Sequence, residues 1–178
     1  MGVHEGLRQE ALNLQEDVYK TSRYHFESSR RWSRWHYGLG LPAIAFSILA
    51  GGTAVSSFDR RGSLVVVLSA LAAIFQSLVL FLDTQGRSTK HHQAGVSLNG
   101  INRALRLMLN VDFCSDSVSE AEALERLRRI GHEVHQINTD APILASHIME
   151  RVNRQLDSRP KRQWIVDIPG DRSSEPQS

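Results

Sequence analysis

Residues 37–82 read YGLGLPAIAFSILAGGTAVSSFDRRGSLVVVLSALAAIFQSLVLFL, which is two apolar runs separated only by Asp59, Arg60 and Arg61. The runs cover 37–58 and 62–82, and each is about as long as the ~20 residues that an α-helix needs to cross a bilayer. Charged residues stand at the ends of the runs and not inside them, as a spanning segment requires. The stretch therefore predicts a two-helix transmembrane hairpin in an integral membrane protein.

Two other interpretations of these runs are weaker. Two buried helices of a soluble bundle would need polar residues on a face that meets solvent, which the runs do not offer. A secretory signal would not begin near residue 37, and its apolar part would be shorter and would not be followed at once by a second run. The rest of the 178-residue chain is polar and leaves room for one small domain in water.

Basic residues near the hairpin predict its orientation. Two basic residues lie in the connecting loop, whereas a larger group flanks the hairpin on the side of the termini: Arg23, Arg30, Arg31, Arg34, Arg87, Lys90 and Arg103. By the positive-inside rule both termini are cytoplasmic, so we expect a multi-pass protein of the inner (plasma) membrane. The single cysteine, Cys114, fits a reducing compartment because one thiol cannot form an internal disulfide.

Residues 5–36 predict a long amphipathic helix, with Leu7, Ala11, Leu14 and Val18 on one stripe. No proline precedes Pro42, so the helix can continue into the first span. Eight residues suit the membrane interface: Arg30, Arg31, Trp32, Arg34, Trp35, His36, Arg87 and Lys90. An arginine and aromatic mixture can also bind nucleic acid, but here it abuts a span. We therefore expect anionic phospholipid, and no nucleic acid, as the partner.

Residues 90–156 predict a cytoplasmic helical bundle. The first helix carries the stripe Ala94, Leu98, Ile101, Leu105 and Met108, and a turn around 112–117 follows it. The second opens with an S-x-x-E capping box at Ser119–Glu122 and carries Leu124, Leu127, Ile130, Val134 and Ile137. The third has Asp140 as N-cap before Ala141 and Pro142, and ends near Leu156.

The overall expectation is an all-α membrane protein with a single domain over 1–156. Ser, Pro and Gly dominate the following residues, so 157–178 predicts a mostly disordered tail. The tail holds one small apolar patch of Trp164, Ile165, Val166 and Ile168.

Enzymatic and metal chemistry is not expected. His132 and His135 are three residues apart, whereas the helical zinc motif H-E-x-x-H needs a spacing of four, with the third ligand defined elsewhere. His91 and His92 are expected to be interfacial residues whose charge varies near neutral pH. The chain has no glycine-rich phosphate loop and no nucleophile beside a recognisable base, so we expect a protein that is not an enzyme and has no cofactor.

The two spans contain small and hydroxylated residues at a spacing of four, which lets helices approach closely. Gln76 also places an amide in the second span, where lipid cannot satisfy it. Because these residues cover more than one face, they indicate a homo-oligomer. The alternative is that they hold one hairpin together. The candidates for helix packing or for lining a pore are Ser47, Gly51, Gly52, Thr53, Ser56, Ser69, Ala73, Gln76 and Ser77.

Three stretches stand out together: RRWSRWHYGLGLP at residues 30–42, HHQAG at 91–95 after a short hairpin loop, and Asp140-Ala141-Pro142 before the last helix. In this arrangement the chain resembles the SLATT family of two-span membrane effectors. The likeness covers most of residues 5–156. It implies a pore-forming effector of a bacterial conflict system, which harms its own cell's membrane when a partner senses infection. The implied partner is a sensor protein or an enzyme that makes a nucleotide signal.

Two functions of different classes follow. The first is an oligomeric membrane effector, pore-forming or membrane-perturbing, in bacterial antiphage defence. The alternative is a non-conducting membrane anchor or scaffold that recruits a soluble partner. A transporter subunit is less well matched, because two spans leave little room for an alternating-access site.

Overall fold

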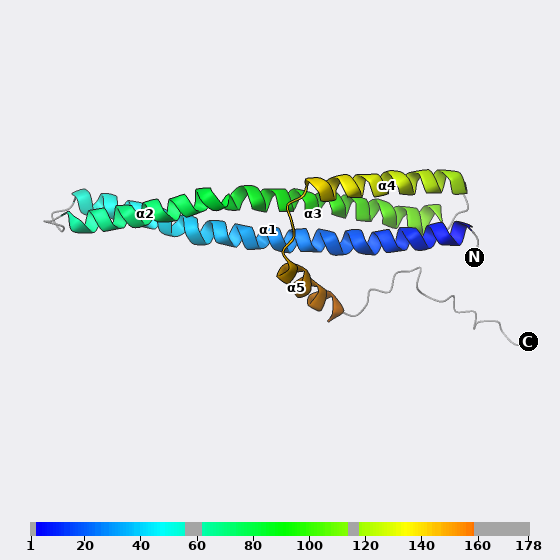
Figure 1. The fold of residues 1–178 in the computed structure, drawn as a ribbon, viewed down its shortest axis with the longest axis horizontal. Coiled ribbons are helices and arrows are strands. Elements are labelled where there is room, and N and C mark those ends of the chain that lie inside the picture. The colour runs from blue at the N-terminus through cyan, green and yellow to red at the C-terminus, as the bar shows by residue number, and fades with distance from the viewer. Residues whose placement is uncertain (1–2, 56–61, 114–117, 159–178) are drawn as a thin grey trace, which may run out of the picture. The chain divides into compact units, whose positions relative to one another are not determined.

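The computed structural model describes residues 3–55, 62–113 and 118–158, and this part of the chain is helical and has no strand (Figure 1). The expected all-α class is confirmed. The elements are α1 (Val3–Val55), α2 (Ser63–Leu82), α3 (Thr84–Leu107), a π-helical segment η1 (Met108–Asp112), α4 (Glu120–Asp140) and α5 (Ser146–Asp157).

Two of the helices are long and apolar enough to cross a membrane. Only 11% and 6% of their most apolar windows are buried by the chain itself, whereas the core helix of a soluble protein is mostly buried. The chain divides into two compact units, a central unit of His25–Gln93 and a terminal unit of Met1–Tyr24 with Ala94–Ser178.

In the central unit, α1 passes through Pro42 without a break, as the sequence predicts. A proline inside a helix lacks one backbone donor, and membrane-spanning helices tolerate this. α2 begins after Gly62, whose φ of 66° lies in the left-handed region that glycine adopts without a steric cost. The expected second span of 62–82 agrees with α2, while the loop residues 56–61 lie outside the described residues.

One residue, Asp83, separates α2 from α3. Its φ of 43° and ψ of 48° place it in the left-handed region, which is uncommon for a residue with a Cβ. Its carboxylate accepts a hydrogen bond from the Gly86 amide at 3.2 Å, so it caps the start of α3. The first helix after the hairpin therefore begins at Thr84 and not at residue 90 as the apolar pattern suggested.

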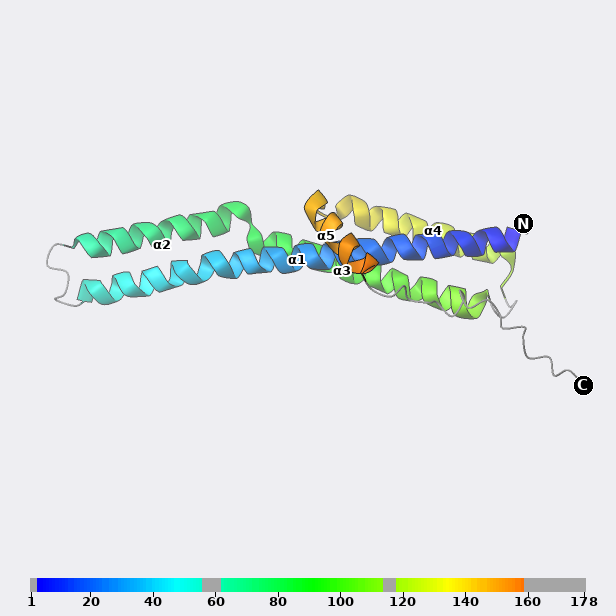
Figure 2. The same cartoon turned by 90° about the horizontal axis from the view of Figure 1, so that it is seen from below.

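The terminal unit holds the larger apolar core. In both ribbon views α3 and α4 run alongside the N-terminal part of α1 (Figures 1 and 2). The predicted stripes meet there, and all five residues of the stripe predicted from Ala94 to Met108 are buried. The buried core consists of Ala11, Val18, Leu98, Ile101, Leu105, Met108, Leu109, Phe113, Ala123 and Leu127.

α3 ends in the π-helical segment η1, where the extra residue in the turn lets both Met108 and Leu109 be buried. The predicted turn at 112–117 is thus still helical at Asp112, and residues 114–117, with Cys114, lie outside the described residues. Arg126 of α4 bonds the Asp112 carboxylate at 2.8 Å and Glu122 at 2.7 Å. The Asp112 bond ties the start of α4 to the end of η1, and the Glu122 bond lies within α4.

The structure of α4 and α5 confirms the predicted start of α4 and corrects two other predictions. The Ser119 hydroxyl accepts from the Glu122 amide, as the capping box predicts. Leu124 is exposed, and Ala123 takes its place in the core. Asp140 is not an N-cap, because it is the last residue of α4 and α5 begins only at Ser146.

α5 has two buried residues, Ile148 and Val152, within the terminal unit. The Tyr24 hydroxyl donates to the Asn153 side chain at 2.6 Å, which fixes α5 beside α1. The predicted tail and its apolar patch of Trp164, Ile165, Val166 and Ile168 fall in 159–178, outside the described residues.

Candidate functional site

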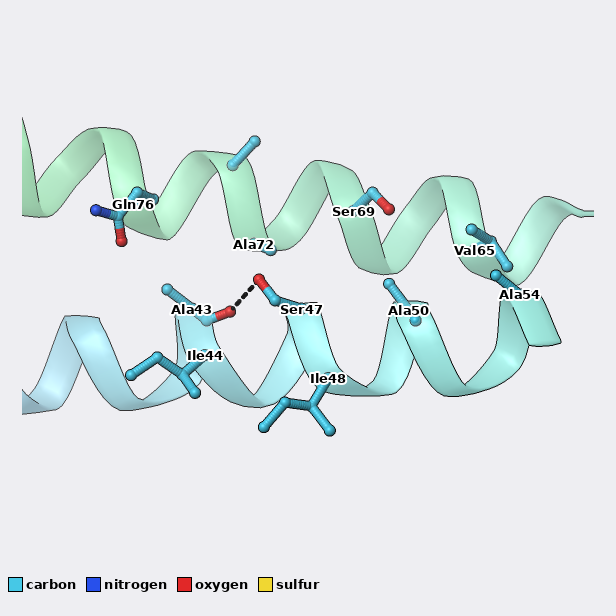
Figure 3. Close-up of a pocket in the computed structure, with 12 residues that line it drawn as sticks. Ala43, Ile44, Ser47, Ile48, Ala50, Ala54, Val65, Ser69, Ala72 and Gln76 are labelled. Carbon is cyan, nitrogen blue, oxygen red and sulfur yellow. Dashed lines mark hydrogen bonds between the residues drawn. The ribbon is translucent and has the colours of Figure 1, made fainter. Parts of the chain in front are cut away.

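The contact between α1 and α2 in the central unit is made by small residues. Ala43, Ala50 and Ala72 are buried there, and short side chains let the two helix backbones approach closely. Figure 3 shows Ser47, Ala50 and Ala54 on the side of α1 that faces α2. Farther round the contact the Phe46 and Phe75 rings lie 5.7 Å apart.

Beside this contact runs an open groove with a volume of about 730 Å³ (Figure 3). Five of the nine residues predicted for packing or pore lining contribute to it: Ser47, Gly51, Ser69, Ala73 and Gln76. Gly52, Thr53 and Ser77 do not line the groove, and Ser56 lies outside the described residues. The structure thus gathers most of the predicted residues at one place without putting all of them on one face.

Two hydroxyl groups of the first span, those of Ser47 and Thr53, are satisfied within α1. Ser47 donates to the Ala43 carbonyl at 2.9 Å, and Thr53 donates to the Leu49 and Ala50 carbonyls at 3.0 Å. These bonds make both side chains compatible with an apolar surrounding.

Gln76 differs from these hydroxyl residues. Its side chain is exposed at the groove, and it makes no hydrogen bond with the residues that the structure describes. Ser69, Ala73 and Ser77 form an exposed row on the same helix. The groove therefore presents small side chains and one amide group whose donors and acceptor face outward.

A second polar site joins α1 to α3 within the central unit, and we call it the polar seam. The Nδ1 atoms of His25 and His91 lie 3.0 Å apart, so one ring donates and the other accepts. Next along the helices, the Ser88 hydroxyl donates to the Ser29 carbonyl at 2.9 Å and lies 3.2 Å from the Ser29 hydroxyl. The last pair of the seam is His36 and Thr84, with His36 Nδ1 lying 3.2 Å from the Thr84 hydroxyl.

Burial sets the charge state of the seam histidines. His25 is 2% exposed and His91 is 3% exposed. Burial, and secondarily the neighbouring His91, lowers the pKa of His25 to about 4. Burial, and secondarily the charge of Arg87, lowers the pKa of His91 as well. Both rings are therefore neutral near pH 7, and the expectation that His91 changes charge there is wrong.

Most of the predicted interface residues are on the surface. Arg30, Arg31, Arg34, Arg87 and Lys90 are exposed, and Trp35 is 49% exposed. The Arg87 guanidinium lies 5.1 Å from the centre of the half-buried Trp32 ring, which is a cation–π contact. His36 lies instead in the polar seam.

Sequence reasoning missed most of the polar seam, although a signal was present. The buried side of α1 follows a heptad spacing of four and three residues from Ala11 onward: Gln15, Val18, Ser22, His25, Ser29, half-buried Trp32 and His36. The stripe loses its apolar character after Val18, so apolar periodicity alone ends it there. Following the spacing and not the hydrophobicity would have found His25 and Ser29.

The histidines of α4 show no metal site. His132 and His135 are exposed, and the described residues contain no group of three or more His, Cys, Asp or Glu side chains placed to hold an ion.

Comparison with known proteins identifies no relative. No family model matches the chain, and neither a curated protein nor a solved structure matches it. The likeness to the SLATT family therefore stays a prediction.

Proposed function

We propose that the chain is an oligomeric integral membrane protein whose hairpins, residues 37–82, associate through the groove beside the α1–α2 contact. The observation that carries the proposal is the exposed Gln76 amide among small side chains. A side-chain amide in hydrocarbon without a partner is costly, and a second helix that brings a donor or acceptor removes that cost. A neighbouring copy in the same orientation supplies such a helix.

The assembly opens a pore or otherwise perturbs the inner membrane, with both termini in the cytoplasm. Ser69, Ala73, Gln76 and Ser77 then lie between copies or at a water path. The resemblance to the SLATT family supports an effector in a bacterial defence system, activated by a sensor or by a nucleotide-signal-producing partner. The neutral interior of both runs favours weak charge selectivity.

The test is the membrane potential of cells that express the full chain, followed with a potential-sensitive dye. The variant Ser69→Leu, Ala73→Leu and Ser77→Leu fills the exposed row. The control variant Val67→Leu with Leu78→Phe adds bulk at two exposed positions that lie about 120° and 140° around α2 from the centre of this row. We expect wild type and the control variant to depolarise the membrane. The row variant should not do so when it is present in the membrane at the same abundance. Depolarisation that survives in the row variant contradicts the proposal.

A scaffold that recruits a soluble partner is the second candidate. It is favoured by apolar side chains exposed outside the apolar runs, namely Val96, Leu107, Val111 and Ile143, which is 96% exposed. Two results together would favour this function over a pore. Wild-type protein would cause no depolarisation even with its genomic neighbours present, and it would still hold a soluble protein at the membrane.

A further inference from the structure

A single strained residue joins α2 to α3 in the central unit. Asp83 has a φ of 43° and a ψ of 48°, and among the described residues it alone has a positive φ without being glycine. A left-handed residue that carries a Cβ costs free energy relative to a helical one, so it persists only where surrounding contacts hold it. Figure 2 shows the chain stepping sideways between α2 and α3. The junction therefore stores strain that a helical conformation of Asp83 would release.

The side of α2 that meets α1 follows steps of three and four residues. We call it the contact stripe, and its members are Leu68, Ala72, Phe75, Val79 and Leu82. The Phe75 ring lies 5.7 Å from the Phe46 ring of α1, which places this stripe on α1. On α3, the polar seam bonds α1 through residues at steps of four and three, namely Thr84, Ser88 and His91.

The contact stripe and the seam residues of α3 do not share one helical phase. From Leu82 to Thr84 the step is two residues, whereas a heptad needs three or four. At about 100° per residue, an unbroken helix would turn the α3 side of the polar seam about 160° away from the contact stripe. The left-handed turn at Asp83 is what lets both sets of residues face α1.

α2 also carries a second stripe, which is in phase with α3. Its members are exposed in this structure, and their steps of four, three and four continue by a step of three into Thr84: Ala70, Ile74, Ser77 and Phe81. If Asp83 were helical, α2 and α3 would form one helix and the second stripe would face α1. Both stripes are made of apolar or small residues, so exchanging one for the other in lipid changes little hydrophobic free energy.

The contacts that hold the left-handed form are few. The Asp83 carboxylate accepts from the Gly86 amide at 3.2 Å, and a Cβ at Gly86 would collide with that carboxylate. The buried side chains of the described part of the two spans are only three alanines: Ala43, Ala50 and Ala72. One cap and a small contact therefore oppose one strained residue. These terms are of similar size, so the two phases are close in free energy.

We propose that Asp83 is a switch of helical phase that presents or removes the groove. In the left-handed form the contact stripe meets α1, and Ser69, Ala73 and Gln76 line the groove. In the helical form the second stripe meets α1, and these three residues turn to the other side of the hairpin. This inference rests on the association through the groove proposed above, and it adds the residue that regulates that site.

The chain offers a matched pair of variants at one position. Asp83→Gly and Asp83→Ala both remove the carboxylate, but only alanine keeps a Cβ that opposes the left-handed form. Relative to Asp83→Gly, Asp83→Ala should therefore raise the ratio of helical to left-handed form about 5- to 30-fold. Gln85→Ala, at an exposed site in the first turn of α3, is the control and should leave the ratio within about 2-fold of wild type.

The measurement is the distance between spin labels on Gly38→Cys and Leu80→Cys, in full-length protein with Cys114→Ser. Gly38 has open space for a side chain and lies about 180° around α1 from Ser47, away from the groove. Leu80 is 71% exposed and lies about 20° around α2 from Ser69, on the groove side. The change of phase brings both labels to one side, so their distance should shorten by about one helix diameter, ~10 Å. Labelled protein is diluted with unlabelled protein so that the distance is read within one chain.

We expect the longer distance in wild type and in Asp83→Gly, and a larger share of the shorter distance in Asp83→Ala. An unchanged distance in Asp83→Ala overturns the inference. Equal shifts in Asp83→Gly and Asp83→Ala also overturn it, because the carboxylate and not the left-handed backbone would then set the phase. If Asp83→Ala fails to fold, Gly86→Ala serves instead. It should shift the distance the same way, because its Cβ disfavours the capped form.

The distance does not depend on conduction, so the two proposals can fail separately. A constant distance together with depolarisation by wild type overturns the switch and leaves the pore. A distance that shifts in Asp83→Ala, with depolarisation equal to that of Asp83→Gly at the same abundance, supports the change of phase and contradicts the role of the groove.

Discussion

Acid should loosen the protein through His25. The pKa of the His25 ring is about 4 in the fold, against an ordinary value of 6.5 in the unfolded chain. As the pH falls, the ring is therefore protonated in the unfolded chain before it is protonated in the folded one. Its contribution to stability is therefore complete above about pH 6.5, is lost as the pH falls toward 4, and changes no further below that. With 1.36 kcal/mol for each pKa unit, the step from pH 7 to pH 5 costs about 2 kcal/mol. For a chain of this size that lowers the melting temperature by about 4 to 8 °C.

The assay is thermal unfolding of the full chain in neutral detergent, followed by helical circular dichroism at pH 7, 6 and 5. His25→Asn keeps a donor and an acceptor near the position of Nδ1 and does not titrate in this range. In this variant we expect the loss to shrink to the share of His91, whose pKa burial also lowers. His135→Asn, at an exposed site on α4, is the control and should keep the wild-type pH profile.

The hydrogen bond between the two rings adds a second reason for the loss. The two Nδ1 atoms share one proton across 3.0 Å, and a second proton removes the acceptor. An NMR titration reads the ring directly. A His25 ring that titrates near 6.5, or equal melting temperatures at pH 7 and pH 5, would refute the reasoning.

Three further predictions concern stability, each measured as the free energy of unfolding of the full chain. Ser119→Ala should cost about 1 kcal/mol because it removes the bond that caps α4, and no loss would contradict the cap. Gly86→Ala should destabilise because the new Cβ would meet the carboxylate that caps α3. Gly100→Ala in the same helix, with nothing within 4 Å, should be neutral or stabilising by up to about 1 kcal/mol. Leu98→Ala, at 0% exposure, should cost about 2 to 5 kcal/mol, whereas Leu107→Ala, at 66%, should stay within about 0.5 kcal/mol.

Apolar periodicity predicted the parts of the fold that apolar burial forms. The stripe predicted from Ala94 to Met108 is buried at every position, and α2 begins within one residue of the expected span. These elements were predictable because one term, the removal of apolar surface from water or its placement in lipid, decides them.

The junction after α4 shows where local signals mislead. Asp140 before Ala141 and Pro142 has the form of a helix start, but the Ala141 amide still bonds the Ile137 carbonyl and completes α4. Ala141 itself is extended, with a ψ of 148°, because the residue before a proline is pushed out of the helical region. The same three residues therefore end one helix and do not begin the next, which starts four residues after the proline.

Apolar periodicity could not predict the polar seam, because hydrogen bonds and not apolar burial form it. An apolar side chain gains stability when it leaves water, whether its new neighbours are protein or lipid tails. A contact made of His25, Ser29 and their partners is stable only while each hydrogen bond has its match. Water can supply those matches if the helices part, so such a contact costs less to open than the core around Leu98 does. Along α1 the heptad spacing continues, but its residues change from apolar to polar. In the polar seam, hydrogen bonds hold α1 against α3, and water or a proton can replace these bonds.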